Sequence, residues 1–312
     1  MKMETAAMHI RSALVLLTAT FFTACGGSSS MSPVPFTSFS AIQQNQPVTA
    51  NGISQTVSAQ TLGVNNVTST TVNPVDPASS SAQMTYTLLP ATPQVTAFSF
   101  STPASSPSFT SVDCGTAAPL CKGSNTNATG TMVNALDPAV AWNYQSFGYW
   151  LVNLSSTSTI AGAMSFGSPT PAAGVPAPTP GVTNTATYTG LSGGTYVDPA
   201  GNVFTHGAFM TSIVDFNART ITFSTTGTQV TPVTVGAVTP VGATLNLSGS
   251  FSYLAGSSQF SGSVSAPAFP AGSTGGAMGQ FYGPTAQELG GVFSLKSPST
   301  QQTMQGGFGG KR

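Results

Sequence analysis

Charge is the property that this 312-residue chain has least of. Lys, Arg, Asp and Glu make up 4% of it, whereas an ordinary soluble domain carries about 25%. From residue 25 onward there are six acidic and five basic side chains, which leaves a net charge of −1. The sequence has no basic patch that could hold a run of phosphates, and this argues against a nucleic-acid partner.

Histidine and cysteine are scarce too. After residue 24 the chain has one histidine, His206, and three cysteines, Cys25, Cys114 and Cys121, and no cluster of them has the spacing of a metal site. Because His206 stands beside a glycine, we expect it to lie exposed in a turn. Catalysis usually needs several titratable groups with mutually adjusted pKa values. The sequence therefore predicts a protein that is not an enzyme, with no catalytic residues, bound metal or cofactor.

Two weak signals in the sequence point the other way. Residues 190–194 read G-L-S-G-G and formally fit the G-x-S-x-G motif of hydrolases. That motif needs a strand-to-helix elbow, and strand-like sequence follows here, so we interpret the segment as a glycine-rich turn. Asp215 and Arg219 are expected to pair across a hairpin, which would be a structural interaction of little energetic weight if exposed.

Long hydrophobic runs are also missing. The apolar run at residues 13–22 is too short to span a bilayer but suits a secretory signal. Small residues precede Cys25, as in a bacterial lipobox, which predicts a signal peptide over residues 1–24 and a lipid anchor on Cys25. Gly26 is not the aspartate associated with inner-membrane retention, which is compatible with an outer-membrane location. The alternative is an ordinary secretory signal followed by a free cysteine.

Serine, threonine, asparagine, glycine and proline replace the missing charges. β-Branched residues with turn signals every ten or so positions predict an all-β fold. In an exported protein Cys114 and Cys121, seven positions apart, are expected to form a disulfide that closes a short loop. A metal site there is the weaker alternative, because no histidine or further cysteine lies nearby.

Composition divides the chain into four parts. The predicted parts are a signal peptide (1–24), a flexible tether (25–45), a β-rich domain with a proline-rich connector (46–180) and a barrel domain (181–312). In the β-rich domain residues 142–152 are the aromatic peak of the chain. Apolar residues on both faces of this segment predict a strand buried between two layers.

Eight strands are expected in the barrel domain. Their predicted ranges are 184–190, 202–205, 208–216, 220–224, 244–252, 259–265, 291–296 and 304–309. In the third, alternation places Met210, Ser212, Val214 and Phe216 on one face. Eight antiparallel strands close into a barrel whose interior is filled by side chains.

The most specific segment is residues 279–293, G-Q-F-Y-G-P-T-A-Q-E-L-G-G-V-F. Pro284 suits the first position of a short helical turn, and the glycine pair allows close backbone approach. We expect Glu288 either to cap this turn or to accept hydrogen bonds from backbone donors near Gly290, and the alternative is an exposed side chain. The singled-out residues are Phe281, Tyr282, Gly283, Pro284, Glu288, Gly290 and Gly291. This run resembles the C-terminal barrel signature of transferrin-binding protein B-like surface lipoproteins, and the resemblance extends over residues 184–312.

The resemblance implies a β-rich handle domain beside an eight-stranded barrel, anchored by lipid to the bacterial outer membrane and facing the cell surface. Family members capture host proteins such as transferrin, haemoglobin or complement factor H, often beside an outer-membrane transporter. We therefore expect a non-enzymatic lipoprotein that binds a protein or iron-related ligand through loops. The alternatives are a structural, adhesive coat lipoprotein without a specific ligand, an integral outer-membrane barrel, and a small-molecule binder with its site between the domains.

Overall fold

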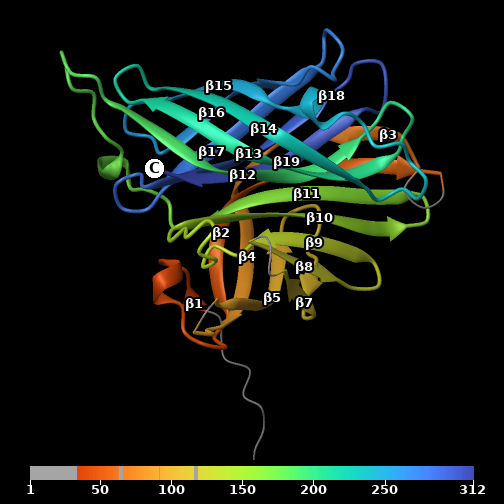
Figure 1. The fold of residues 1–312 in the computed structure, drawn as a ribbon, viewed down its shortest axis with the longest axis horizontal. Coiled ribbons are helices and arrows are strands. Elements are labelled where there is room, and N and C mark those ends of the chain that lie inside the picture. The colour runs from red at the N-terminus through yellow and green to blue at the C-terminus, as the bar shows by residue number, and fades with distance from the viewer. Residues whose placement is uncertain (1–33, 63–65, 91, 116–118) are drawn as a thin grey trace, which may run out of the picture. The chain divides into compact units, whose positions relative to one another are not determined.

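The computed structural model describes residues 34–62, 66–90, 92–115 and 119–312, and its regular structure is almost entirely β (Figure 1). The first half forms one eleven-stranded sheet in the order β6-β5-β4-β2-β11-β10-β9-β8-β7, with β1 and β3 paired to β2. The elements are β1 (Val34–Pro35), η1 (Phe39–Ala41), β2 (Val48–Thr61), β3 (Val67–Val72), β4 (Asp76–Thr87), β5 (Gln94–Ser101), β6 (Ser108–Phe109), β7 (Val112–Cys114), β8 (Leu120–Ser124), β9 (Ala128–Val133), β10 (Gln145–Ser155) and β11 (Ser158–Gly167).

The second half is a closed antiparallel barrel of eight strands. Its elements are η2 (Ala172–Gly174), β12 (Thr185–Val197), β13 (Val203–Asp215), β14 (Thr220–Pro232), η3 (Gly242–Leu245), β15 (Ser248–Tyr253), β16 (Gln259–Ser265), β17 (Thr274–Tyr282), β18 (Glu288–Lys296) and β19 (Thr303–Lys311). The predicted all-β fold with an eight-stranded barrel is confirmed. Within the described ranges, none of the helices combines the length and apolarity that crossing a bilayer requires.

The barrel interior is filled with aromatic and aliphatic side chains. Phe223 and Phe308 have ring centroids 4.8 Å apart, and Phe251 stacks on Phe260 at 5.7 Å. The alternation predicted for the third strand holds, because the four residues of its apolar face are buried in the barrel core. They are Met210, Ser212, Val214 and Phe216.

Several predicted strand boundaries are wrong. The strand expected at 244–252 begins at Ser248, after η3, and those expected at 184–190 and 220–224 continue to Val197 and Pro232. The strands expected at 202–205 and 208–216 are one continuous strand, β13, which runs through the expected turn at His206 and Gly207. A glycine breaks a strand only if its dihedral angles or pairing require it. Gly207 pairs with Gly193 on β12, and the irregularity next to it is a register shift towards β14. The barrel still has eight strands because it contains β17, which was not among the predicted ranges. The glycine-rich start of β17 gives little β-propensity signal.

The expected tether is folded over its described part. β1 pairs in parallel with β2, and Phe39 in η1 is buried, with its ring centroid 6.1 Å from that of Tyr86. Serine and proline content predicted a flexible leash, but Phe36 and Phe39 supply enough apolar surface to hold this segment on the sheet. The ordered chain therefore includes residues 34–45.

The aromatic strand β10 is buried on both faces, as predicted, because it lies between the core of the sheet and the barrel. On one side Trp150 stacks on Phe100 at 4.6 Å. On the other side Phe147 lies so close to the barrel that a Cβ atom on Gly307 would be 2.9 Å from its ring. Strands β2, β10 and β11 of the sheet contact β12, β18 and β19 of the barrel.

Candidate functional site

The segment singled out in the sequence lies where the barrel meets the sheet. Glu288 begins β18, and its side chain is 3% exposed. Its Oε1 accepts a hydrogen bond from the backbone N–H of Asn143 at 2.6 Å, and its Oε2 accepts those of Tyr144 at 2.8 Å and Gln145 at 2.9 Å. One barrel carboxylate therefore holds the three residues with which the chain enters β10. The expectations that Glu288 caps its own turn or lies exposed are wrong. It accepts backbone donors, as the other expectation held, but they come from residues 143–145 of the sheet and not from the chain around Gly290.

Two opposing effects act on this carboxyl group. Burial raises the pKa of Glu288, while the three backbone N–H donors and the nearby Lys311 act to lower it. The Lys311 ammonium also donates a hydrogen bond to the carbonyl oxygen of Ala141 at 3.2 Å. These contacts are all with the protein itself, so the arrangement suits docking of the barrel onto the sheet.

The residues just before Glu288 extend the same contact. The Tyr282 hydroxyl lies 2.9 Å from the Ser165 Oγ of β11. The backbone N–H of Gly283 donates to the Ser168 carbonyl at 2.9 Å, and the Thr170 hydroxyl donates to the Gly283 carbonyl at 2.7 Å. We call the barrel residues Tyr282, Gly283 and Glu288, with their partners in the sheet and the connector, the docking clasp.

The predicted helical turn in this segment is wrong. Gly283 has a φ of 80° and Ala286 a φ of 59°, both in the left-handed region that a right-handed helical turn does not contain. Pro284 lies in this turn, exposed, while Phe281 before it is buried in the barrel core.

Close approach explains the glycine pair in the segment. A Cβ atom on Gly290 would lie 2.6 Å from Ser165 Oγ, and one on Gly291 would lie 2.5 Å from the Met278 carbonyl oxygen. Gly290 therefore lets the sheet reach the barrel, and Gly291 lets two barrel strands come together. Both roles depend on the missing side chain.

Cys114 and Cys121 are joined by a disulfide, as predicted. They are directly opposite each other on β7 and β8, at one end of the order of strands in the sheet. Cys25 lies outside the described residues. Within the described part of the chain, no three His, Cys, Asp or Glu side chains come together as a metal site would require.

His206 is buried, which corrects the expectation that it is exposed in a turn. It is 3% exposed on β13, with its Nε2 3.4 Å from the Gln305 carbonyl oxygen and its ring 6.0 Å from that of Phe293. Burial lowers the pKa of His206 to about 4, and the contact with Gln305 opposes this shift only in part. The imidazole is therefore neutral at physiological pH.

Two other sequence signals also have structural explanations. Residues 190–194 lie inside β12 and form neither the expected turn nor a nucleophile elbow, and Ser192 Oγ donates to the Gly307 carbonyl at 3.2 Å. Asp215 does not show the expected pairing with Arg219. Its Oδ1 accepts the backbone N–H groups of Asn217 and Ala218 at 2.8 and 3.0 Å instead.

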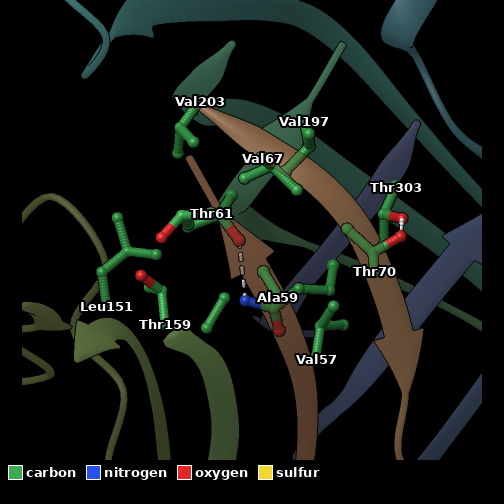
Figure 2. A pocket seen from close by; sticks show the side chains of 13 residues that line it. Val57, Ala59, Thr61, Val67, Thr70, Leu151, Thr159, Val197, Val203 and Thr303 are labelled. Carbon is green, nitrogen blue, oxygen red and sulfur yellow. Dashed lines mark hydrogen bonds between the residues drawn. The ribbon is translucent and has the colours of Figure 1, made fainter. Parts of the chain in front are cut away.

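A small cavity lies between the sheet and the barrel (Figure 2). Its volume of about 20 Å³ is room for little more than a water molecule. Valines and threonines line it, and the hydroxyls of Thr70 and Thr303 lie 2.6 Å apart at one side. The cavity does not support the alternative of an organic small molecule bound between the domains.

Loops are the most exposed apolar feature of the barrel. The loop at 233–247 joins β14 to β15, and Val235, Val238 and Val241 in it are 99%, 86% and 69% exposed. The loops at 198–202, 266–273 and 297–302 share this barrel end, because the strands alternate in direction. The sequence predicted binding through loops but did not single out this one, although its four valines, two glycines and one proline in residues 233–242 are a visible signal.

These features define a two-part β protein in which a closed barrel is docked onto a sheet and extends loops with little charge, Asp198 being the single ionisable residue of the four loops at this end. The family described as the C-lobe and N-lobe β barrels of transferrin-binding protein B matches residues 180–312. This segment belongs to that family, as the resemblance in residues 279–293 predicted.

Similar solved structures share little sequence with the chain. A transferrin-binding protein B mutant from Haemophilus parasuis Hp5 is 14% identical, over 83% of this chain and 45% of that one, with a TM-score of 0.46. HpuA from Kingella denitrificans, solved in complex with human haemoglobin, is 15% identical over 83% of this chain and 87% of that one, with a TM-score of 0.42. The chain thus spans less than half the length of the Haemophilus protein. No curated protein sequence matches it.

Proposed function

We propose that this chain is a non-enzymatic lipoprotein of the bacterial cell surface, anchored to the outer membrane through Cys25, that binds a protein ligand. The contact surface is the loop at 233–247. The observation that carries the proposal is the exposure of Val235, Val238 and Val241, which are 69–99% exposed in one loop. Membership of residues 180–312 in the transferrin-binding protein B barrel family supports it.

The loop has the physical character of a recognition element. Binding residues lie disproportionately on loops that a rigid scaffold positions, and the exposed valines precede η3 and its buried Leu245, which hold the end of this connection on the barrel. Exposed apolar side chains grouped in one segment mark a surface that gains free energy when a partner covers it. No charged residue lies between Arg219 and Glu288, so the partner surface facing this loop is apolar and the association depends little on ionic strength.

Relatives suggest which proteins to test first. The matching family is described by transferrin binding, and HpuA was solved with human haemoglobin. Purified full-length chain in mild detergent should therefore be tested against immobilised human transferrin and human haemoglobin at two salt concentrations. We expect one of them to be retained with little dependence on salt. Failure of both to bind would overturn a ligand of this class.

A matched pair of variants tests the loop itself. Val235→Asp combined with Val238→Asp should reduce ligand retention at least tenfold, because two charges would be desolvated in the contact. The control is Leu254→Asp, which alters an 80% exposed apolar residue in a hairpin at the opposite end of the barrel. Equal loss in the control, or none in the loop variant, would refute the assignment to this loop.

Anchoring and exposure have separate tests. Mass spectrometry should find a lipid-modified N-terminus at Cys25, and Cys25→Ser should release the protein from the membrane fraction. Protease treatment of intact cells should digest the wild-type protein. Protection from the protease would place the protein inside the envelope and would rule out an extracellular ligand.

A further inference from the structure

The outer wall of the barrel carries an array of hydroxyl groups. Across β12 to β16, fifteen outward positions lie in three rows defined by the strand registers, and thirteen of them are serine or threonine. The rows are Thr189-Thr211-Ser224-Ser248-Ser265, Thr187-Ile213-Thr222-Ser250-Ser263 and Thr185-Asp215-Thr220-Ser252-Ser261. We call these fifteen residues the hydroxyl face.

This face is free of the rest of the molecule. The sheet strands β2, β10 and β11 contact the barrel through β12, β18 and β19, and β14 to β16 lie away from them (Figure 1). Eleven of the hydroxyl-bearing residues are exposed, and Thr211 and Ser224 are half-buried. Strand geometry places neighbours in a row about 4.8 Å apart and rows about 7 Å apart. The result is a regular two-dimensional grid of groups that each donate and accept hydrogen bonds.

Charge on the face is limited to one side chain. Asp215 is its single ionisable residue, and one of its carboxylate oxygens already accepts two backbone N–H groups. An anionic partner would find no counter-charge on this face, which argues against nucleic acids, anionic lipids and acidic polymers.

The composition of the face also differs from that of a protein contact. Protein interfaces are enriched in Tyr, Trp, Phe, Met and Arg and depleted in Ser, whereas serine and threonine dominate this wall. Two apolar side chains interrupt the hydroxyls, Ile213 within the grid and Phe209 one position beyond it on β13, and they are 48% and 68% exposed. A surface of hydroxyl groups with two exposed apolar side chains complements a ligand that presents both hydroxyl groups and C–H surfaces.

We propose that the hydroxyl face binds an uncharged polysaccharide. Repeated sugar hydroxyls would exchange hydrogen bonds with the grid, and the C–H face of a ring would pack on Phe209 or Ile213. Each contact is weak because water competes for it, so binding requires a polymer that spans many positions at once. This surface is separate from the loop at 233–247 and would serve attachment to a matrix or a cell coat.

Sedimentation with insoluble neutral polysaccharides tests the proposal. The full-length chain should be mixed with cellulose, chitin and starch granules, and with an anionic alginate gel for comparison. We expect retention on at least one neutral polymer, little effect of 0.5 M salt, competition by soluble fragments of that polymer and no retention on alginate. No retention on any neutral polymer would overturn the proposal, as would equal retention on alginate.

Variants assign the binding to the face. Thr222→Glu with Ser263→Glu places two charges in the grid without placing them directly opposite each other, and should reduce retention at least tenfold. The control, Ser69→Glu with Thr96→Glu, adds the same charge at exposed strand positions of the sheet. Circular dichroism should show all of these proteins folded. Val235→Asp with Val238→Asp should leave retention unchanged, so this test and that of the protein ligand can fail independently. Equal loss in the control would refute the assignment.

Discussion

Glu288 and Gln145 are 143 positions apart, yet the Glu288 carboxylate accepts a hydrogen bond from the Gln145 backbone N–H at 2.9 Å. The same carboxylate accepts the two preceding N–H groups, so a single side chain of the barrel fixes the start of a central strand of the sheet. The most distinctive segment of the sequence therefore encodes the attachment between the two parts of the protein. This is a structural role that a search for catalytic groups would misassign.

Removal of that carboxylate should loosen the attachment. In Glu288→Ala three backbone N–H groups would lose a buried acceptor, and we expect the free energy of unfolding to fall by about 3 kcal/mol. Urea denaturation followed by tryptophan fluorescence measures the change, because Trp142 and Trp150 are buried in the sheet. The control Thr285→Ala, at an exposed position of the same segment, should change stability by less than about 0.5 kcal/mol. A similar small effect of Glu288→Ala would contradict the role of the docking clasp.

The sequence predicted those features of the fold that depend on residues close together in the chain, and missed those that depend on distant residues. Strict alternation identified the buried face of β13, and two apolar faces correctly placed β10 between layers. The partners of Glu288 could not be predicted, because Asn143, Tyr144 and Gln145 are distant in sequence and contribute backbone groups, which any residue type would offer equally.

Glycine and histidine misled the prediction for a related reason. Gly207 beside His206 suggested a turn, yet pairing with β12 keeps both in a strand and buries the imidazole. The glycine-rich start of β17 gave no propensity signal, and the pairing with β18 determines its structure. The hydroxyl face was visible only as an excess of serine and threonine until the strand registers aligned those residues into rows.

The buried imidazole predicts a pH dependence of stability. The pKa of His206 is lowered from 6.5 to about 4 in the folded protein. Between these values the unfolded chain binds a proton that the folded chain does not, so the free energy of unfolding should fall as the pH drops from 6.5 to 4. The slope is at most about 1.4 kcal/mol per pH unit.

The variant His206→Gln isolates this contribution. Asp76 and Glu288 also have shifted pKa values, but both remain in the variant, so their effects cancel in the difference between the two proteins. Denaturation curves of wild type and variant at pH 7, 6, 5 and 4 should show the advantage of the variant growing as the pH falls. A constant difference over this range would mean that His206 is not held neutral.

The disulfide should stabilise the end of the sheet. It closes a loop of eight residues, for which chain-entropy estimates give about 2–3 kcal/mol. The double variant Cys114→Ala with Cys121→Ala should be less stable by about that amount in urea denaturation. Reductant should lower the stability of the wild type and leave the variant unchanged. An unaffected wild type would show that the bond contributes nothing to global stability.

Replacement of a buried amide near the docking clasp should increase stability instead of lowering it. The Gln145 side chain is fully buried, and neither its Nε2 nor its Oε1 has a hydrogen-bond partner among the described residues. It packs against the barrel so closely that a Cβ atom on Gly309 would lie 2.4 Å from each of these atoms. Gln145→Met keeps the length of the side chain and removes two unpaired polar atoms, so we expect the free energy of unfolding to rise by about 1 kcal/mol.

A second buried glutamine supplies the matched comparison. Gln305 is also nearly fully buried and its Oε1 has no partner among the described residues, but its Nε2 donates a hydrogen bond to Thr195 Oγ1 at 2.9 Å. Gln305→Met would leave that hydroxyl without its donor, and we expect a loss of about 1 kcal/mol where Gln145→Met gains. Thermal unfolding of the two variants beside wild type decides between the signs. An equal drop in melting temperature for both substitutions would contradict this prediction. It would mean that the Gln145 amide forms hydrogen bonds in solution, because removal of an unbonded amide would not lower stability as much as removal of the bonded Gln305 amide.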